Sequence, residues 1–466
     1  MQWDEFSEWG AKISQWAADY HTTLRERTVR AQTEPGDVAA LIAPSAPEGP
    51  HAMTEIMEDF ERVVMPGITH WQHPRFFAYF PANAAPPSML AEMLVSTIAA
   101  QCMLWQTSPA ATEMETVMLD WLRQAIGLPN KFSGVIQDSA SSATLVAVLT
   151  MRERALKWNG NKAGLSGAAR LRIYCSEEVH TSVDRAIWVA GIGQENLVRI
   201  PISGKLRSMN PQLLKEAIQS DIAAGHCPAG IVACTGGTGT GACDDLSEVL
   251  KISKEFDLYS HVDAAWAGAG MICPEFRDLW SGVEAADSVV FNPHKWLGAQ
   301  FDCSAHFLAD PTSLVKTLAI QPEYLKTHGR DGLINYSEWS VPLGRRFRAL
   351  KLWFLLRSYG LEALRLRLRN HVSWADDLAK RLEDNPQFEI VTAPILSLFT
   401  FRLTEFDDAA QIDFVNRIND DGQIYITQTK VDGKIVIRFQ IGQFDVTEAD
   451  IQFAYKVMCE MLSKLG

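Results

Sequence analysis

The chain has 466 residues, of which 47% are hydrophobic and 21% charged, so a disordered chain and a disulfide-stapled miniprotein are both excluded. Lys and Arg number 43 against 56 Asp and Glu, and the net charge of −13 argues against a nucleic-acid or anionic-membrane partner. The eight cysteines lack metal-like spacing, and the chain has neither a basic, apolar leader nor a long apolar run. We therefore expect a cytoplasmic protein with reduced thiols and no bound metal.

The first eighty residues predict helices joined by loops. An apolar residue recurs every three or four positions near the N-terminus, which predicts a helix with one apolar stripe. The stripe consists of Trp3, Phe6, Trp9, Ile13, Trp16 and Tyr20. Nothing in the neighbouring sequence indicates what covers this stripe. Further helical patterns occupy residues 53–65, 88–103 and 112–127, with a proline-rich loop over 35–50.

Beyond residue 134, short apolar runs alternate with helical stretches. Strands are predicted at residues 134–137, 171–175, 230–234, 258–263 and 288–291, and helices at 141–158, 182–190 and 246–256. This alternation predicts an α/β fold around a mostly parallel central sheet, with ligands bound at the carboxyl ends of its strands. A long helical region over 350–382, strands at 396–402 and 435–440 and a last helix over 447–465 predict a small C-terminal α+β domain.

The central segment supports two interpretations. The run Gly237-Thr-Gly-Thr-Gly-Ala242 matches the glycine pattern of dinucleotide-binding loops, and Asp263 follows about 20 residues later, where such proteins carry a ribose-binding acid. Asp263 and Lys295 together suit pyridoxal phosphate (PLP) instead, because PLP needs a lysine for its imine and a carboxylate for its pyridinium nitrogen.

A phosphate cradle, the third requirement of PLP, is met at residues 138–142. Small residues there follow a predicted strand and open a predicted helix, whose N-terminus favours an anion. Taken alone, these serines are better explained as a helix N-cap. With Asp263 and Lys295 in the same sheet, the phosphate interpretation becomes the stronger one.

Six motifs follow one another along the chain, at residues 66–71, 76–81, 112–115, 261–268, 292–296 and 342–348. Together they resemble the group II PLP-dependent amino-acid decarboxylases, most closely the aromatic-L-amino-acid decarboxylases, over nearly the whole chain. The resemblance implies PLP-dependent fold type I (aspartate aminotransferase-like). It divides the chain into an N-terminal helical dimerisation segment (1–82), a large PLP-binding domain (83–350) and a small C-terminal domain (351–466). It also implies a homodimer with active sites at the interface, which would bury the N-terminal stripe.

The resemblance implies roles for individual residues. Lys295 forms the imine with PLP, Asp263 pairs with the pyridinium nitrogen, and His180 stacks on the ring and contacts the substrate. The cofactor-binding residues it implies are Ala140, Ser141, His180, Thr238, Asp263, Ala265, Asn292, His294 and Lys295. Decarboxylation then proceeds through an external aldimine and a quinonoid, and Tyr324, on a mobile loop, returns a proton to Cα. The catalytic set is Lys295, His180, Tyr324 and Asp263.

The expected substrate is an aromatic L-amino acid (tryptophan, phenylalanine, tyrosine or dopa), which is converted to its arylalkylamine and CO2. The predicted substrate-binding residues are Trp71, Tyr79, Phe80, Met103 and Gly344.

Three alternatives remain open. A decarboxylase of the same group acting on a non-aromatic amino acid would need a charged group for the distal end of its substrate, and none is evident in this pocket. An aromatic aldehyde synthase is disfavoured, because such relatives carry Phe at position 324 or replace the histidine at position 180. A non-catalytic PLP-binding protein is disfavoured by the intact catalytic set.

Overall fold

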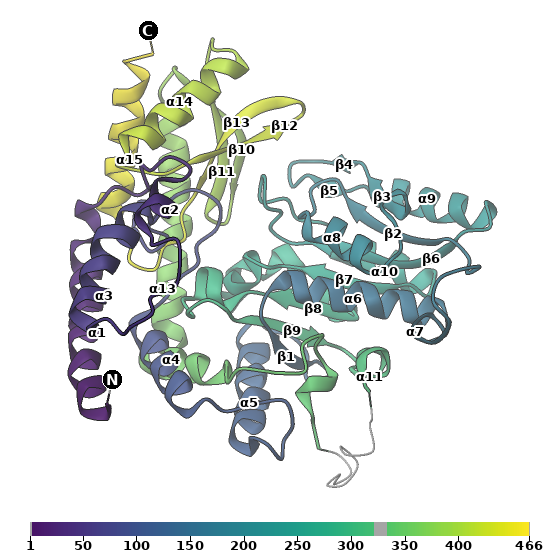
Figure 1. The fold of residues 1–466 in the computed structure, drawn as a ribbon. Helices are drawn as coiled ribbons and strands as arrows, with labels where there is room; N and C mark the ends of the chain where they lie inside the picture. Colours follow the sequence, from purple (N-terminus) through teal and green to yellow (C-terminus); the bar gives the residue numbers. More distant parts are fainter. Residues whose placement is uncertain (1, 321–332, 466) are drawn as a thin grey trace. The chain divides into compact units, whose positions relative to one another are not determined.

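The computed structural model describes residues 2–320 and 333–465, which form two compact units. The terminal unit comprises Met1–Pro81, Asp377–Val391 and Thr400–Gly466, and the central unit comprises Ala82–Asp376 and Thr392–Phe399. Figure 1 shows both units, coloured along the chain. The three-part division expected from the sequence stays a prediction. Among the described residues, no helix combines the length and the apolar character needed to cross a membrane.

A seven-stranded sheet lies at the core of the central unit, in the order β1-β9-β8-β7-β6-β2-β3. Its strands are β1 (Ser133–Gln137), β2 (Leu171–Ser176), β3 (Leu197–Ile200), β6 (Cys227–Cys234), β7 (Tyr259–Asp263), β8 (Ser288–Phe291) and β9 (Ser304–Leu308). Neighbours from β8 to β3 pair in parallel, whereas β9 lies antiparallel between β1 and β8. The predicted α/β fold with a mostly parallel sheet is therefore confirmed. A separate short pair consists of β4 (Ile202–Ser203) and β5 (Ser208–Met209).

The central unit also contains helices, several of which begin at capping residues or prolines. They are α4 (Pro86–Ile98), α5 (Pro109–Ala125), α6 (Ala140–Ala155), α7 (Gly160–Ala163), α8 (Ser182–Val189), α9 (Pro211–Ala223), α10 (Leu246–Glu255), α11 (Thr312–Leu318) and α13 (Ala349–Glu383), which is interrupted at Gly360. Side chains of Asn210 and Asp245 cap α9 and α10. α6 packs along the sheet against β6, β7, β8 and β9 (Figure 1). Because β1 leads into α6 through two residues, the N-terminus of α6 lies at the carboxyl edge of the sheet.

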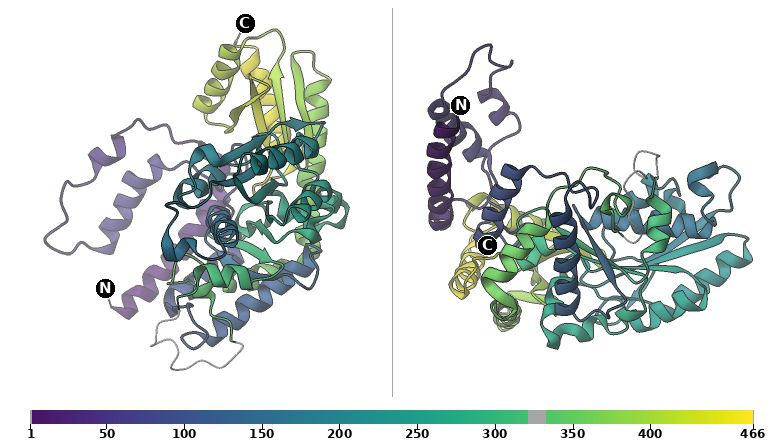
Figure 2. Two further views of the ribbon diagram at one scale, coloured as in Figure 1. Left: turned by 90° about the vertical axis from the view of Figure 1, so that its right-hand side faces the viewer. Right: turned by 90° about the horizontal axis from the view of Figure 1, so that it is seen from below.

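The terminal unit combines N-terminal helices with a C-terminal sheet. Its helices are α1 (Trp3–Thr23), α2 (Asp37–Leu41), α3 (Met53–Asp59), α14 (Asp408–Asp421) and α15 (Glu448–Leu462). The sheet has the order β10-β11-β13-β12, with β10 (Phe388–Ile395), β11 (Leu398–Leu403), β12 (Thr427–Val431) and β13 (Lys434–Gln440). α14 packs against β12, β13 and α15 (Figure 2). The buried carboxylate of Asp450 joins the two ends of the chain through ion pairs with Arg25 at 2.8 Å and Arg75 at 3.1 Å.

The apolar stripe on α1 is partly covered within its own chain. Trp16 packs edge-on against Phe60, with ring centroids 5.2 Å apart, and stacks on Tyr20. The first half of the helix is open, with Trp3 82% and Phe6 51% exposed. None of the residues of α1 is buried, so its packing within the described chain does not account for the stripe.

Buried histidines make the stability of this fold depend on pH. Burial lowers the pKa of His294, His306 and His371 to about 3. In the unfolded chain these rings titrate near their usual pKa of about 6.5, so below that pH the unfolded state binds more protons than the native state. Asp244 acts in the opposite direction, because burial raises the pKa of its carboxyl to about 6, but His73 and His261, whose pKa values burial also lowers, add to the effect of the three histidines.

We therefore expect the free energy of unfolding to fall as the pH is lowered from 7 to 5. Each of the three histidines contributes up to roughly 1.4 kcal/mol per pH unit below 6.5. Urea unfolding at a series of pH values measures this slope, and the variant His306→Gln should show a shallower one. A free energy of unfolding that stays constant between pH 7 and 5 contradicts the expectation.

Candidate active site

The predicted cofactor lysine lies in a short π-helical turn, Pro293–Leu297, that directly follows β8. Its neighbour Trp296 is 1% exposed and stacks on Trp266, with ring centroids 5.2 Å apart. Trp296 Nε1 also donates a hydrogen bond of 2.9 Å to His371 Nδ1. Trp296 is thus anchored in the core, and this leaves the half-buried Lys295 at the carboxyl edge of the sheet.

Asp263 ends the neighbouring strand β7. In the parallel β7–β8 pair Asp263 lies in register with Val290, so Asp263 and Lys295 leave the sheet at the same edge. Asp263 is 8% exposed, and its Oδ1 accepts a hydrogen bond of 3.0 Å from the backbone N–H of Ala265. This bond fixes the carboxylate at the end of the strand.

His180 lies within electrostatic reach of both residues. Partial burial lowers the pKa of its imidazole; Asp263 opposes this shift and Lys295 adds to it. The backbone N–H of Ser182 donates to His180 Nδ1 at 3.1 Å, so the neutral ring carries its proton on Nε2. The structure therefore brings together the three described members of the predicted catalytic set.

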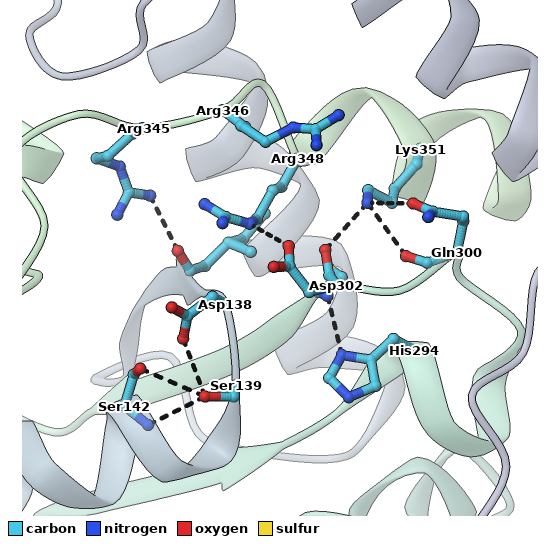
Figure 3. A network of polar contacts seen from close by, with 12 residues as sticks. Asp138, Ser139, Ser142, His294, Gln300, Asp302, Arg345, Arg346, Arg348 and Lys351 are labelled. Atoms are coloured by element: carbon cyan, nitrogen blue, oxygen red, sulfur yellow. Dashed lines mark hydrogen bonds and ion pairs between the residues drawn. The ribbon is translucent and has the colours of Figure 1, made fainter. Parts of the chain in front are cut away.

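The predicted phosphate cradle lies where β1 runs into α6. Ser139 Oγ accepts from Ser142 N at 3.2 Å and donates to Asp138 Oδ1 at 2.9 Å (Figure 3). Ser139 is therefore the helix N-cap, while the predicted phosphate ligands Ala140 and Ser141 occupy the first turn, where N–H groups have no partner within a helix. Ala140 packs in one apolar cluster with Ala143, Val290 and Ala265, and this cluster connects the cradle to the segment after Asp263.

Asn292 and His294 flank the lysine turn and are both buried. Asn292 N donates to Ala265 O at 2.8 Å, while its Oδ1 is a buried polar atom with no hydrogen-bond partner among the described residues. His294 Nδ1 accepts a hydrogen bond of 2.9 Å from Cys303 N. Because the pKa of His294 is about 3, its ring is neutral and carries its proton on Nε2, which makes Nε2 a donor.

The glycine run after β6 forms a closed turn. Gly236 N and Gly237 N both donate to Ala242 O, and Gly241 N donates to Gly237 O. At Gly236, with φ of 85°, a Cβ would lie 2.5 Å from the Cβ of Ala267, so only glycine fits. The dinucleotide interpretation is wrong, because the run does not open a helix: α10 begins only at Leu246 and is capped by Asp245. The half-buried Thr238 lies within this turn.

The terminal unit carries an aromatic cluster that contains two predicted substrate residues. Trp71 stacks on Tyr79 with centroids 5.8 Å apart, and Phe76 lies against both. Tyr425, which the sequence analysis did not identify, lies edge-on to Phe76 and Tyr79 at 5.3 and 6.1 Å. Trp71 and Tyr79 are 40% and 48% exposed, whereas the neighbouring Phe80 is buried.

Arg438, on β13, is a second residue that the sequence analysis missed. Its Nη1 donates to the backbone carbonyl of Tyr79, and its guanidinium lies over the ring of Phe80, 4.5 Å from the centroid. Burial lowers its pKa to about 9, so it stays charged at neutral pH. Arg438 is thus a charged group beside Phe80 that the sequence analysis did not identify. Only the fold could reveal it, because Arg438 is more than 350 positions away in the sequence.

Met103 and Gly344, the other predicted substrate residues, belong to the central unit. Their segments are joined by Cys102 N donating to Arg345 O at 3.0 Å and by Arg345 N donating to Gln101 Oε1 at 2.6 Å. Gly344 and Gln101 line a cavity of about 440 Å³ together with three arginines. Tyr324, the predicted proton donor, lies outside the described residues.

Comparison with known proteins agrees with this geometry. The Pyridoxal-dependent decarboxylase conserved domain matches residues 35–404. The chain belongs to this family of decarboxylases. It is 40% identical to aromatic-L-amino-acid decarboxylase of Sus scrofa over 470 residues, covering 98% of this chain and 96% of that protein. It is 36% identical to phenylacetaldehyde synthase of Arabidopsis thaliana over 480 residues, covering 100% and 97%.

Among solved structures, the fold of this decarboxylase is similar to that of Oryza sativa TDC with PLP and tryptamine. The TM-score is 0.96 at 31% identity, with 100% of this chain and 99% of that chain covered. The protein is a PLP-dependent carboxy-lyase of fold type I, and its cofactor is PLP.

The residues present in this decarboxylase fit PLP. The carboxyl edge offers an amine and a carboxylate on adjacent strands, Lys295 and Asp263. For the phosphate it offers the open first turn of α6 and the donor Nε2 of His294. Rotating the side-chain amide of Asn292 by 180° turns its NH2 to the position of the unpartnered buried oxygen, so Asn292 can also donate.

Proposed function

We propose that this chain decarboxylates an aromatic L-amino acid, namely tryptophan, phenylalanine, tyrosine or dopa, to the corresponding arylalkylamine and CO2. The observation that carries the proposal is the meeting of Lys295, Asp263 and His180 at one edge of the parallel sheet. The aromatic cluster around Tyr79 supports an aromatic substrate, because flat aromatic surfaces bury and stack on a ring. The name of the relative from Sus scrofa points the same way.

Lys295 would hold the cofactor through its amine. Asp263, fixed by Ala265 N–H, keeps the pyridinium nitrogen protonated. Bound PLP supplies the electron sink that accepts the bonding pair when the carboxylate leaves as CO2. Ala140, Ser141, Asn292 and His294 would hold the phosphate, and the small side chain of Ala265 would leave room for the ring.

His180 would pack against the cofactor ring. Its lowered pKa keeps the imidazole neutral at pH 7, with the donor Nε2–H free to orient the substrate. Thr238 donates its hydroxyl to the substrate carboxylate or a neighbouring group. Tyr324 returns a proton to Cα after CO2 has left, and this step commits the enzyme to the amine product.

Two other candidate functions each have a specific observation in their favour. An aromatic aldehyde synthase is favoured by the relative from Arabidopsis thaliana, but Tyr324 and His180 favour simple decarboxylation. A decarboxylase for an amino acid with an acidic side chain is favoured by the buried charge of Arg438 beside Phe80. The same product analysis separates all three.

Purified protein with PLP should release amine and CO2 from at least one of tryptophan, phenylalanine, tyrosine and dopa, and far less from glutamate. In Tyr324→Phe under air, amine should give way to aldehyde and ammonia, because the hydroxyl that protonates Cα is gone and dissolved O2 can oxidise that carbon, being reduced to H2O2. Chromatography of the products and an ammonia assay measure both results. The variant Tyr336→Phe, which changes a buried tyrosine bonded to Thr116, serves as the matched control.

Preferred release of CO2 from glutamate would contradict the aromatic assignment and favour the role of Arg438 in binding an acidic substrate. Full amine production by Tyr324→Phe would remove Tyr324 from the mechanism and leave the substrate assignment intact. Aldehyde as the main product of the unaltered chain would favour the synthase.

We further propose that the chain forms a homodimer whose partner covers the first half of α1. Trp3, Phe6 and Ile13 lie on one side of a helix with no buried residue and are 82%, 51% and 44% exposed. On α4, Leu90, Met93 and Ile98 are also more than half exposed. Two apolar helix surfaces on one chain fit a second copy of that chain, and the resemblance implies active sites at such an interface.

Light scattering after gel filtration should therefore give the mass of a dimer. The double variant Phe6→Glu/Ile13→Glu should dissociate at concentrations where the unaltered protein stays dimeric, because it places charge in the apolar surface. Ala11→Glu, on the opposite side of α1, adds the same kind of charge outside the stripe and should leave the dimer intact. A monomeric unaltered protein, or a double variant as dimeric as the control, would refute the interface.

We also propose a cytoplasmic location. All eight cysteines are free thiols, which is typical of a reducing compartment.

A further inference from the structure

The turn Gln300–Cys303, between the lysine turn and β9, holds His294 at three points. Cys303 N donates to His294 Nδ1 at 2.9 Å, and His294 N donates to Cys303 O at 3.3 Å. The ring of Phe301 lies edge-on to the ring of His294, with centroids 4.7 Å apart. Where this turn lies therefore decides where the Nε2–H of His294 points.

Lys351, near the start of α13, holds the same turn from the other side. Its Nζ donates to Gln300 O at 3.1 Å, Gln300 Oε1 at 2.9 Å and Asp302 O at 3.0 Å (Figure 3). It also pairs with Glu92 Oε1 on α4 at 2.7 Å. Lys351 is 1% exposed, so this ammonium is buried among four oxygens, three of which belong to the turn.

Arg348 adds a second cation to the same turn. Its Nε donates to Asp302 Oδ1 at 2.7 Å. Burial lowers the pKa of Arg348, but the hydrogen bond and the charge of Asp302, with smaller contributions that include the charge of Asp138 in the cradle, together raise it. The charge of Asp302 also partly opposes the lowering of the His294 pKa by burial. Both cations therefore bond to Asp302, in the turn that holds His294 (Figure 3).

Stability alone does not explain such an arrangement. Burying an ion pair costs desolvation that its attraction often only offsets, so an apolar side chain could hold α13 as well. An ammonium group has three N–H donors, and these donors fix the positions of the oxygens around it. Here those oxygens define the backbone of the turn that orients His294.

We infer that Lys351 and Arg348 are positioning residues for the phosphate subsite: they clamp the Gln300–Cys303 turn, and the turn presents the Nε2–H of His294 to the cofactor phosphate. The inference rests on the proposed function, which assigns His294 to that phosphate. Neither cation touches PLP in this arrangement; both act through His294.

The test compares the affinities for PLP and for pyridoxal, which lacks the phosphate. In Lys351→Met the dissociation constant for PLP should rise roughly 10-fold, while that for pyridoxal should change less than about 2-fold, because only the phosphate contact is lost. Asp302→Asn, which keeps its carbonyl bond to Lys351 but weakens the bond to Arg348, should show a smaller loss in the same direction. Titration of the apoenzyme, followed by visible absorbance, measures both constants.

Arg369→Met is the matched control. Arg369 lies on the same helix and pairs with Glu275 at the surface, away from the turn. In Lys351→Met, Glu92 keeps a partner in Arg346, so no carboxylate is left alone. His294→Ala should weaken PLP binding by itself, and adding Lys351→Met to it should cause little further loss, because both changes remove the same contact.

Each other result has a distinct meaning. If Lys351→Met loses affinity equally for PLP and pyridoxal, the clamp is overturned. The same holds if its loss of PLP affinity adds to that of His294→Ala. Both results leave the proposed function standing. An unaltered protein that binds pyridoxal as tightly as PLP would instead overturn the phosphate subsite itself. If Lys351→Met does not fold, Asp302→Asn tests the clamp in its place, again by comparing the rise in the dissociation constant for PLP with that for pyridoxal.

Discussion

The parallel pairing of β7 with β8 is the constraint on which the rest of this site depends. It places Asp263 and the lysine turn at one edge of the sheet, because the carboxyl ends of parallel neighbours meet there. The anchoring of Trp296 against Trp266 and His371 then excludes the lysine from the core. An amine and a carboxylate on adjacent strands are what a pyridine aldehyde cofactor needs at its two ends.

Residues far from that edge fix the geometry of the donors around it. His180 and His294 each accept a backbone N–H on Nδ1, so in both rings the proton lies on Nε2. For His294 that backbone belongs to a turn held by Lys351 on α13 and by Arg348, just before that helix. Burial keeps His294 neutral, so its Nε2–H can donate without adding a charge.

Local pattern predicted the strands whose ends carry the site, since each is a short buried run followed by small or polar residues. It did not predict β9, whose buried positions include Ser304 and His306 and so lack an apolar run. By itself it left the glycine run at 237–242 open to two interpretations, because a closed turn and a helix opening share the same glycine spacing. Lys351 and Arg438 could not be found from the sequence, because their partners lie tens to hundreds of positions away. The sequence placed Ser139 at the start of a helix but could not separate a capping role from a phosphate-binding one, because both occur at the same helix end.

The most direct measurement of the central claim is reduction of the yellow holoenzyme with borohydride, followed by mass mapping of its peptides. Reduction makes the bond between PLP and its lysine permanent. The pyridoxyl mass should appear on the peptide that contains Lys295 and vanish, with the yellow colour, in Lys295→Ala. A pyridoxyl group on another lysine, or a yellow protein that keeps its colour in Lys295→Ala, would contradict the assignment of the β7–β8 edge as the cofactor site.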